Sequence, residues 1–236
     1  MKHYTLAFSI AALSLFGGTQ NSYAQDSGIK VGIKVSPGIA MGRVIDKDSK
    51  DGVGFSSNGS AFAFSFGPQF DFPVLKQNVY FTTGVWFSIK SIKVTSNAIG
   101  IVSGSSKYNL QYITVPLAFK FYTNEIAPDI RLYFTLGGTL DVKISEGVSG
   151  DDDAGLKTAS QDDGKKLFLP VDGNLLLGTG VQFKVGETTL FAGVSYLRGL
   201  VNVINPNLTW GSDDDKPTNH VALKNNTLNL DLGIEF

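Results

Sequence analysis

A histidine close to a serine and a run of aspartates supplies the residue types that a hydrolase or an acyltransferase needs. Downstream of residue 24 the chain has one histidine, His220, which follows Ser212 and the run Asp213 to Asp215. A triad works only when the base is positioned against both the nucleophile and an orienting carboxylate. The spacing does not show that arrangement, so we predict that the protein is not an enzyme and has no catalytic residues. A lipid-modifying enzyme that uses His220 is the alternative.

The aspartate runs, Asp151 to Asp153 and Asp213 to Asp215, could instead bind calcium, which takes several oxygen ligands. The first run, between Gly150 and Gly155, has neither the spacing of an EF-hand loop nor its terminal glutamate. An acidic run of this kind is usually a solvated loop. We therefore predict no metal site and no cofactor.

Scattered charges form a third group of candidate residues. Four are basic, namely Lys30, Lys34, Lys120 and Arg131, and three are acidic, namely Asp141, Asp172 and Asp231. The basic set would make a cation-lined channel if it faced an open pore. In a narrow interior that side chains fill, opposite charges pair instead. We predict pairing between the two sets.

The composition limits the class of protein that carries these residues. Among 236 residues, Lys plus Arg is 20 and Asp plus Glu is 21, which gives no reason to expect a nucleic-acid partner. Charged residues make up 17% of the chain, below the roughly 25% of soluble domains. The absence of cysteine excludes disulfides and thiol chemistry. These values favour a protein whose exterior is not entirely in water.

The first residues have the features of an export signal. Met1-Lys2-His3 is a short basic start, Tyr4 to Phe16 is apolar, and small residues at Ser22 and Ala24 suit a signal peptidase. The apolar run is shorter than the roughly 20 residues of a membrane-spanning helix. We predict a Sec signal peptide over residues 1–24 and one domain over residues 25–236.

The predicted domain is built from eight segments in which apolar and polar residues alternate, the pattern of β-strands. The segments are 29–35, 62–72, 79–93, 108–122, 130–144, 168–185, 189–203 and 227–236. Connections at 73–78, 123–129 and 186–188 are short, and those at 46–59, 95–107, 145–167 and 204–223 are long and polar. Because connections in an up-and-down meander alternate between its two ends, every long loop would emerge at the same end.

The two faces of these segments predict where the domain sits. The polar face is rich in Gly, Ser, Thr and Ala with few charges, which suits a narrow interior better than a water-facing surface. The apolar face is continuous for about ten residues per strand, close to the 9–11 that a tilted membrane strand needs. We predict an all-β, eight-stranded antiparallel transmembrane barrel, closed because lipid cannot satisfy backbone polar groups. A secreted soluble barrel around an apolar ligand is the other alternative.

Aromatic residues provide a further expectation. Phe72, Tyr80, Phe81, Phe121, Tyr122 and Phe236 gather near the short-turn end, as an interfacial girdle would. Trp86 has the parity of the polar face, so we expect it inside the barrel.

Several short motifs resemble the PorT-like outer-membrane β-barrel family of Bacteroidota. The first motif is Tyr-Ile-Thr-Val-Pro-Leu-Ala-Phe-Lys, which contains Tyr112, Pro116 and Lys120. The second contains Gly178 and Gly180, and the third contains Tyr196, followed by Gly199-Leu200. The last is Leu-Gly-Ile-Glu-Phe, which contains Gly233. The resemblance implies an OmpX-like barrel of the outer membrane, without catalytic or ligand residues. It also implies that Phe236 is an assembly signal for the barrel-assembly machinery. The expected partners are outer-membrane lipids and a protein bound at the long, acidic extracellular loops, and the expected roles are envelope structure, surface interaction or help in secretion.

Overall fold

The fold is taken from a computed structural model, which describes residues 28–46, 53–57, 59–75, 78–98, 101–150, 168–205 and 221–236. The predicted signal peptide, residues 1–24, lies outside this part of the chain. The described strands are β1 (Lys30–Asp46), β2 (Val53–Ser57), β3 (Ser60–Leu75), β4 (Val79–Gly84), β5 (Trp86–Ala98), β6 (Ile101–Tyr122), β7 (Ile130–Gly150), β8 (Val171–Val185), β9 (Thr188–Gly199) and β10 (Val221–Glu235). No described helix is long and apolar enough to cross a membrane.

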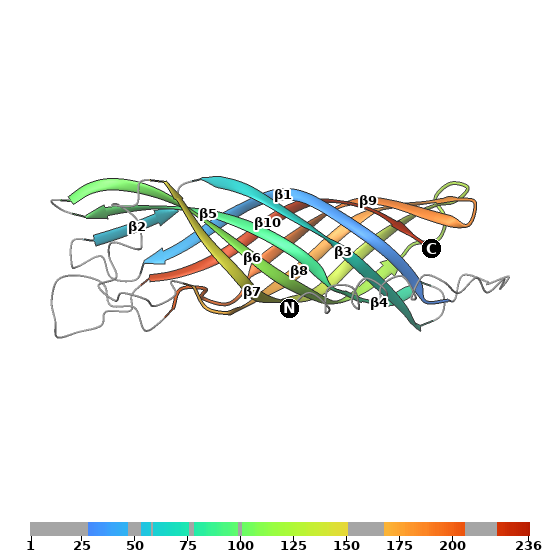
Figure 1. The fold of residues 1–236 in the computed structure, drawn as a ribbon. Coiled ribbons are helices and arrows are strands. Elements are labelled where there is room, and N and C mark those ends of the chain that lie inside the picture. The colour runs from blue at the N-terminus through green and yellow to red at the C-terminus, as the bar shows by residue number, and fades with distance from the viewer. Residues whose placement is uncertain are drawn as a thin grey trace, which may run out of the picture.

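The strands form one antiparallel sheet that closes on itself (Figure 1). β1 pairs with β3 on one side and with β10 on the other, so the first and last strands complete the barrel. β2 and β3 both pair with β5 and act as one strand, and β4 and β5 both pair with β6 and act as another. The ten described segments therefore make eight barrel strands, which confirms the predicted architecture.

The interruption between β4 and β5 has a cause in the neighbouring strand. Pairing with β6 stops after Thr83–Leu117 and resumes at Trp86–Thr114. Pro116 lies in that interval and has no N–H to donate to the ladder. On the other side, the Val85 amide donates to the Pro68 carbonyl at 3.2 Å, so the strand continues through the gap.

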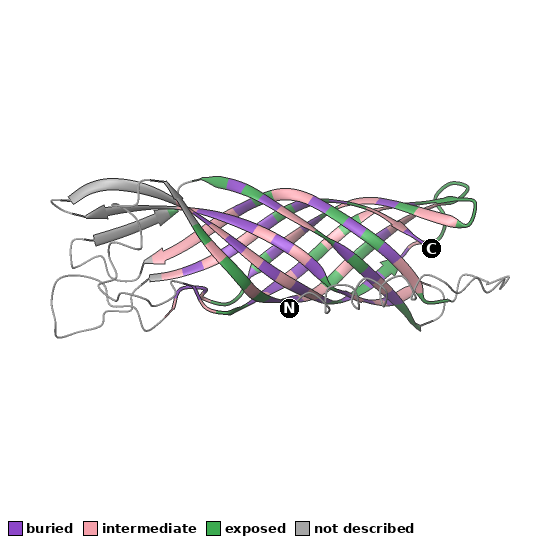
Figure 2. Cartoon of the chain, viewed as in Figure 1, coloured by how far each residue is buried: buried purple, intermediate pink, exposed green. Residues whose placement is uncertain are grey.

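The outward face carries the apolar residues, as predicted. Leu117 of β6 is 51% exposed and Leu230 of β10 is 49% exposed, although both are large and apolar. Figure 2 shows exposed and buried residues alternating along the strands. We call this outward apolar surface the apolar belt; its members include Ile33, Val35, Phe62, Phe66, Phe119, Phe134, Leu136, Leu140, Leu177, Val194, Leu228 and Leu232. A soluble barrel with an apolar interior is thereby excluded.

The two ends of the barrel differ, and parts of the predicted long loops are strand. Short connections follow β3, β6 and β8, and the end of the barrel at which these strands finish is called the short-turn end; the opposite end is called the long-loop end. The prediction of a loop over 95–107 is wrong, because β5 and β6 remain paired as far as Ala98 and Ile101. Part of the predicted 46–59 loop is strand β2. Strand segments that extend beyond the hydrocarbon of the membrane need no apolar face. Their sequence is therefore polar and resembles that of a loop.

The predicted aromatic girdle is only partly correct. Phe72, Phe121 and Phe236 are exposed near the short-turn end, as expected. Tyr80 and Tyr122 are instead buried inside the barrel, where their rings meet edge to face at 5.5 Å between centroids. Both have the parity of the interior face, and that parity prevails over the general preference of tyrosine for membrane interfaces.

Candidate functional site: the barrel interior

The interior near the short-turn end holds a network of buried ion pairs, called here the lower cluster. Lys120 of β6 lies 2.5 Å from Asp71 Oδ2 and 3.0 Å from Glu235 Oε1. Lys34 of β1 lies 3.3 Å from Asp231 Oδ1, which also accepts a hydrogen bond of 2.6 Å from Ser36. Removing one member of a buried pair leaves its partner's charge uncompensated. The network thus ties β1, β3, β6 and β10 together from inside.

Aromatic rings cover the lower cluster, and glycines make room for them. Tyr133 packs against Tyr122 and Phe191, and the Lys30 ammonium lies 4.6 Å from the centroid of the Tyr122 ring. A Cβ at Gly180 would lie 2.4 Å from the Tyr133 hydroxyl oxygen. The same oxygen would be 2.3 Å from a Cβ at Gly193. Tyr133 can therefore lie across β8 and β9 only because both positions are glycine.

Trp86 fills the middle of the interior, as its parity predicted. Its ring is buried, and the Lys34 ammonium lies 3.7 Å from the ring centroid in a cation–π contact. Leu176 and Leu197 pack with Ala118 on the inner face close by. The small cavity that Trp86, Lys34 and Lys120 help to line has room for about one water molecule.

A second group of charges, called here the upper cluster, lies toward the long-loop end. Lys90 of β5 is 2.5 Å from Asp141 Oδ2 and 3.9 Å from Asp172 Oδ2. Asp141 of β7 and Asp172 of β8 are directly opposite cross-strand partners. The Asn174 side-chain amide donates to Asp141 Oδ2 at 2.9 Å. All four side chains are buried, so the charges of Lys90, Asp141 and Asp172 interact without the screening that water provides.

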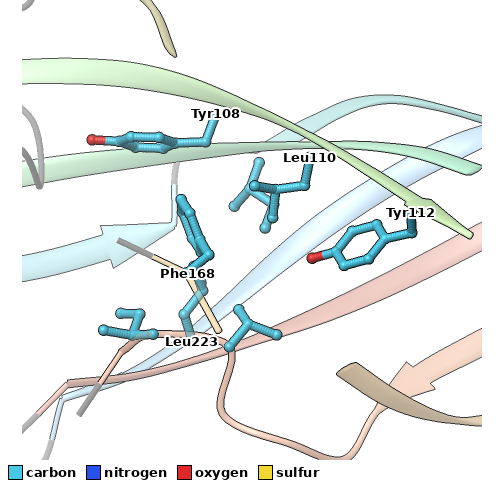
Figure 3. Packing of buried hydrophobic residues seen from close by; sticks show 8 residues of the cluster. Tyr108, Leu110, Tyr112, Phe168 and Leu223 are labelled. Atoms are coloured by element: carbon cyan, nitrogen blue, oxygen red, sulfur yellow. The ribbon is translucent and has the colours of Figure 1, made fainter. Parts of the chain in front are cut away.

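A cluster of buried apolar side chains, called here the apolar cap, lies toward the long-loop end, and Figure 3 shows how its members pack. Its members are Ile92, Tyr108, Leu110, Tyr112, Phe168, Val203, Ile204 and Leu223. Phe168 and Ile204 form an isolated bridge, and the Leu169 amide donates to the Val203 carbonyl at 2.8 Å. The ends of two long connections therefore fold into the mouth. The predicted strand that started at residue 168 begins instead at Val171.

The pairing predicted for the interior charges is right in kind and partly wrong in detail. Lys34 pairs with Asp231, as expected. Lys120 pairs with Asp71 and Glu235, while Arg131 pairs with Glu125 at the short-turn end. The partner of Asp141 and Asp172 is Lys90, which the sequence reasoning missed. Lys90 has the same parity as Trp86 and Ser88, and that signal was sufficient to place it inside.

The family-motif residues lie on both sides of the wall. Tyr112 and Lys120 are buried in the interior, and Pro116 interrupts the ladder of β6. Gly180 accommodates Tyr133, and Gly233 accommodates the Phe191 ring, whose Cζ would lie 2.3 Å from a Cβ at that glycine. Gly178 has only ordinary contacts at 3.5 Å, and Tyr196 is half-buried. Phe236 continues the β1–β10 seam, since its amide donates to the Val31 carbonyl at 2.8 Å.

The residues of the candidate triad, His220, Ser212 and the run Asp213 to Asp215, lie outside the described residues. The run Asp151 to Asp153 also lies outside them. Within the described residues, no group of three or more His, Cys, Asp or Glu side chains could hold a metal ion.

Comparison with known proteins identifies the family. Residues 23–205 match the family model described as outer membrane protein beta-barrel domain. The chain belongs to this family. An outer-membrane barrel explains both the apolar belt and the polar, ion-paired interior, because its outer surface meets lipid. The protein is therefore located in the outer membrane.

A solved structure agrees with this fold. The outer-membrane barrel resembles the outer membrane protein OprG from Pseudomonas aeruginosa with a TM-score of 0.51 and 11% identity, over 90% of this chain and 99% of OprG. Neisserial surface protein A matches with a TM-score of 0.44 and 15% identity, over 88% of this chain and 97% of that one. No curated protein matches the chain.

Proposed function

We propose that the protein is a closed, non-enzymatic barrel that contributes to envelope structure and to interaction at the cell surface. The filled interior is the observation that carries this proposal. Between the two mouths, the lumen contains the lower cluster, Trp86, the upper cluster and the apolar cap. Eight strands enclose an interior that side chains just fill, so no continuous aqueous path is expected.

The strands at the long-loop end support a role at the surface. β6 has 22 residues and β7 has 21, about twice the 9–11 that cross the hydrocarbon. Their backbones pair as far as Ser106 and Gly150, beyond the apolar belt. We infer that this end faces the exterior and presents its long, acidic loops to a protein partner, while the short turns face the periplasm. The resemblance to PorT-like barrels of Bacteroidota supports a helper role in secretion.

A conductance measurement tests the closed lumen. The purified protein is inserted in a planar lipid bilayer, with insertion checked by protease protection. We expect no steady conductance at moderate voltage. A stable open level in the unmodified protein would refute the closed barrel. We also expect unchanged lipid A and phospholipid composition in a His220→Ala strain, because the proposal assigns no lipid chemistry to the protein.

The lack of cysteine makes the orientation directly testable. Asp152→Cys places one thiol in a long connection, and Glu187→Cys places one in the short turn between β8 and β9. A membrane-impermeant maleimide should label the first variant on intact cells and the second only after the outer membrane is permeabilised. The reverse pattern would place the long loops in the periplasm and contradict the proposed surface role.

A further inference from the structure

The upper cluster has one more negative charge than its lysine can neutralise. Asp141 and Asp172 are both within 4.0 Å of the Lys90 ammonium, at 2.5 and 3.9 Å. The other described lysine in this half of the lumen, Lys143, is bound to Glu146 and to the Phe168 carbonyl. Like charges directly opposite each other on neighbouring strands are destabilising. Burial increases that penalty, because an uncompensated charge away from water is strongly destabilising.

Several of the oxygens around this charge have no hydrogen-bond donor. Asp141 Oδ1 and both oxygens of Asp172 have no hydrogen-bond partner. Asn174, which is 2% exposed and already bound to Asp141 through its amide nitrogen, has no partner for its Oδ1. The hydroxyl of Tyr112, a buried member of the apolar cap that is labelled in Figure 3, likewise has no hydrogen-bond partner. Carboxylate, amide and hydroxyl oxygens are the ligands that hard cations take.

We propose that the upper cluster binds one monovalent metal cation, sodium or potassium, between Asp141, Asp172 and Asn174. One positive charge beside Lys90 makes the cluster neutral, whereas a divalent ion would leave an excess of positive charge. The apolar cap above the site, formed in part by Phe168 and Leu223, shields the ion from bulk water. This site is separate from the proposed surface role and does not depend on it.

The lower cluster provides a control variant for the test of this proposal. Asp231 is also a buried aspartate of the barrel wall, and it is bound by both Lys34 and Ser36. Asp231→Asn therefore removes a carboxylate whose charge has a partner. Asp172→Asn removes the carboxylate that lies farther from the Lys90 ammonium, at 3.9 Å, and it keeps the shape of the side chain.

The test is the dependence of unfolding on the type of cation. The refolded protein is unfolded by urea at constant ionic strength while choline chloride is replaced stepwise by NaCl or KCl. A ligand that binds only the folded state lowers the unfolding constant about tenfold per tenfold rise in its concentration above Kd. We expect that dependence for the unmodified protein and for Asp231→Asn. Asp172→Asn should lose it and should be at least as stable as the unmodified protein in choline.

A direct binding signal makes the result independent of whether the variants fold. The ²³Na resonance should broaden on addition of the unmodified protein and sharpen again with excess potassium. Three results would overturn the proposal. The first is equal stability in choline, sodium and potassium, and the second is stabilisation by calcium alone. The third is a stability that depends on pH but not on any cation and that loses its pH dependence in Asp172→Asn. That result would indicate that the two aspartates share a proton.

Discussion

Lys120 of β6 and Glu235 of β10 meet across the lumen, with 3.0 Å between Nζ and Oε1. Counted around the closed sheet, the number of strands that lie between β6 and β10 is the same in either direction. The pair therefore spans the diameter of the barrel. The same ammonium also binds Asp71 of β3. One lysine therefore joins three strands of which none is adjacent to another.

Replacement of this lysine should be among the most damaging changes in the interior. Lys120→Met leaves Asp71 and Glu235 buried without a positive partner. Breaking a buried pair in this way costs about 3–5 kcal/mol of the free energy of unfolding. Urea titration in detergent, followed by tryptophan fluorescence, measures the loss. Lys184→Met, which changes an exposed lysine at the short-turn end, should stay close to the original stability.

The lipid-facing assignment predicts a cost that depends on depth. Leu230→Arg puts a charge on the apolar belt and should cost about 2–4 kcal/mol near the bilayer midplane. Val185→Arg, beside the short turn at Gly186, should cost only about 0–1 kcal/mol, as expected near the interface. Equal costs for both variants in phospholipid vesicles would show that residue 230 does not face hydrocarbon.

Two motif glycines should respond differently to the same change. Gly180→Ala puts a methyl group 2.4 Å from both the Tyr133 hydroxyl oxygen and the Ala192 carbonyl oxygen. Overpacking of this kind typically costs about 1–3 kcal/mol. Gly178→Ala should cost much less, because its nearest neighbours are 3.5 Å from the new methyl group. Urea midpoints of the two variants, measured side by side, check the difference.

Phe236 should matter for assembly. Its backbone extends the seam between β1 and β10 by hydrogen bonds with Val31, and its ring is exposed at the short-turn end. Deletion of Phe236 should reduce the fraction of protein that shows heat-modifiable migration on a gel. Phe236→Tyr keeps both the backbone pairing and an aromatic ring and should assemble normally. Normal assembly after the deletion would mean that the residue is not an assembly signal.

The alternation of side chains was sufficient to predict the barrel. Along β6, for example, Leu117 and Phe119 face outward and Ala118 and Lys120 face inward, as the sequence pattern requires. A strand that separates lipid from a polar interior must alternate, so the pattern is strong wherever the strand crosses the membrane. That reasoning also placed Trp86 and Lys34 inside.

The same pattern fails where its physical cause is absent. Beyond the membrane, β5 and β6 separate no lipid from the interior, so their sequence has no alternating pattern there, although the two strands stay paired as far as Ala98 and Ile101. Phe168 folds into the mouth from a connection, and no periodicity marks such a residue. Lys90 was missed for a different reason, since its parity was informative but was not used.

The contrast between the apolar belt and the ion-paired lumen has a consequence for how such sequences diverge. Acyl chains are fluid and accommodate any apolar side chain of moderate size, so exchanges of one apolar residue for another on the outside should have little effect on stability. Each interior lysine, by contrast, constrains its carboxylates on distant strands, and a change at one position requires a compensating change at another. In homologous chains, the apolar residues of the exterior should therefore vary independently of one another, while the charged residues that pair across the lumen should covary.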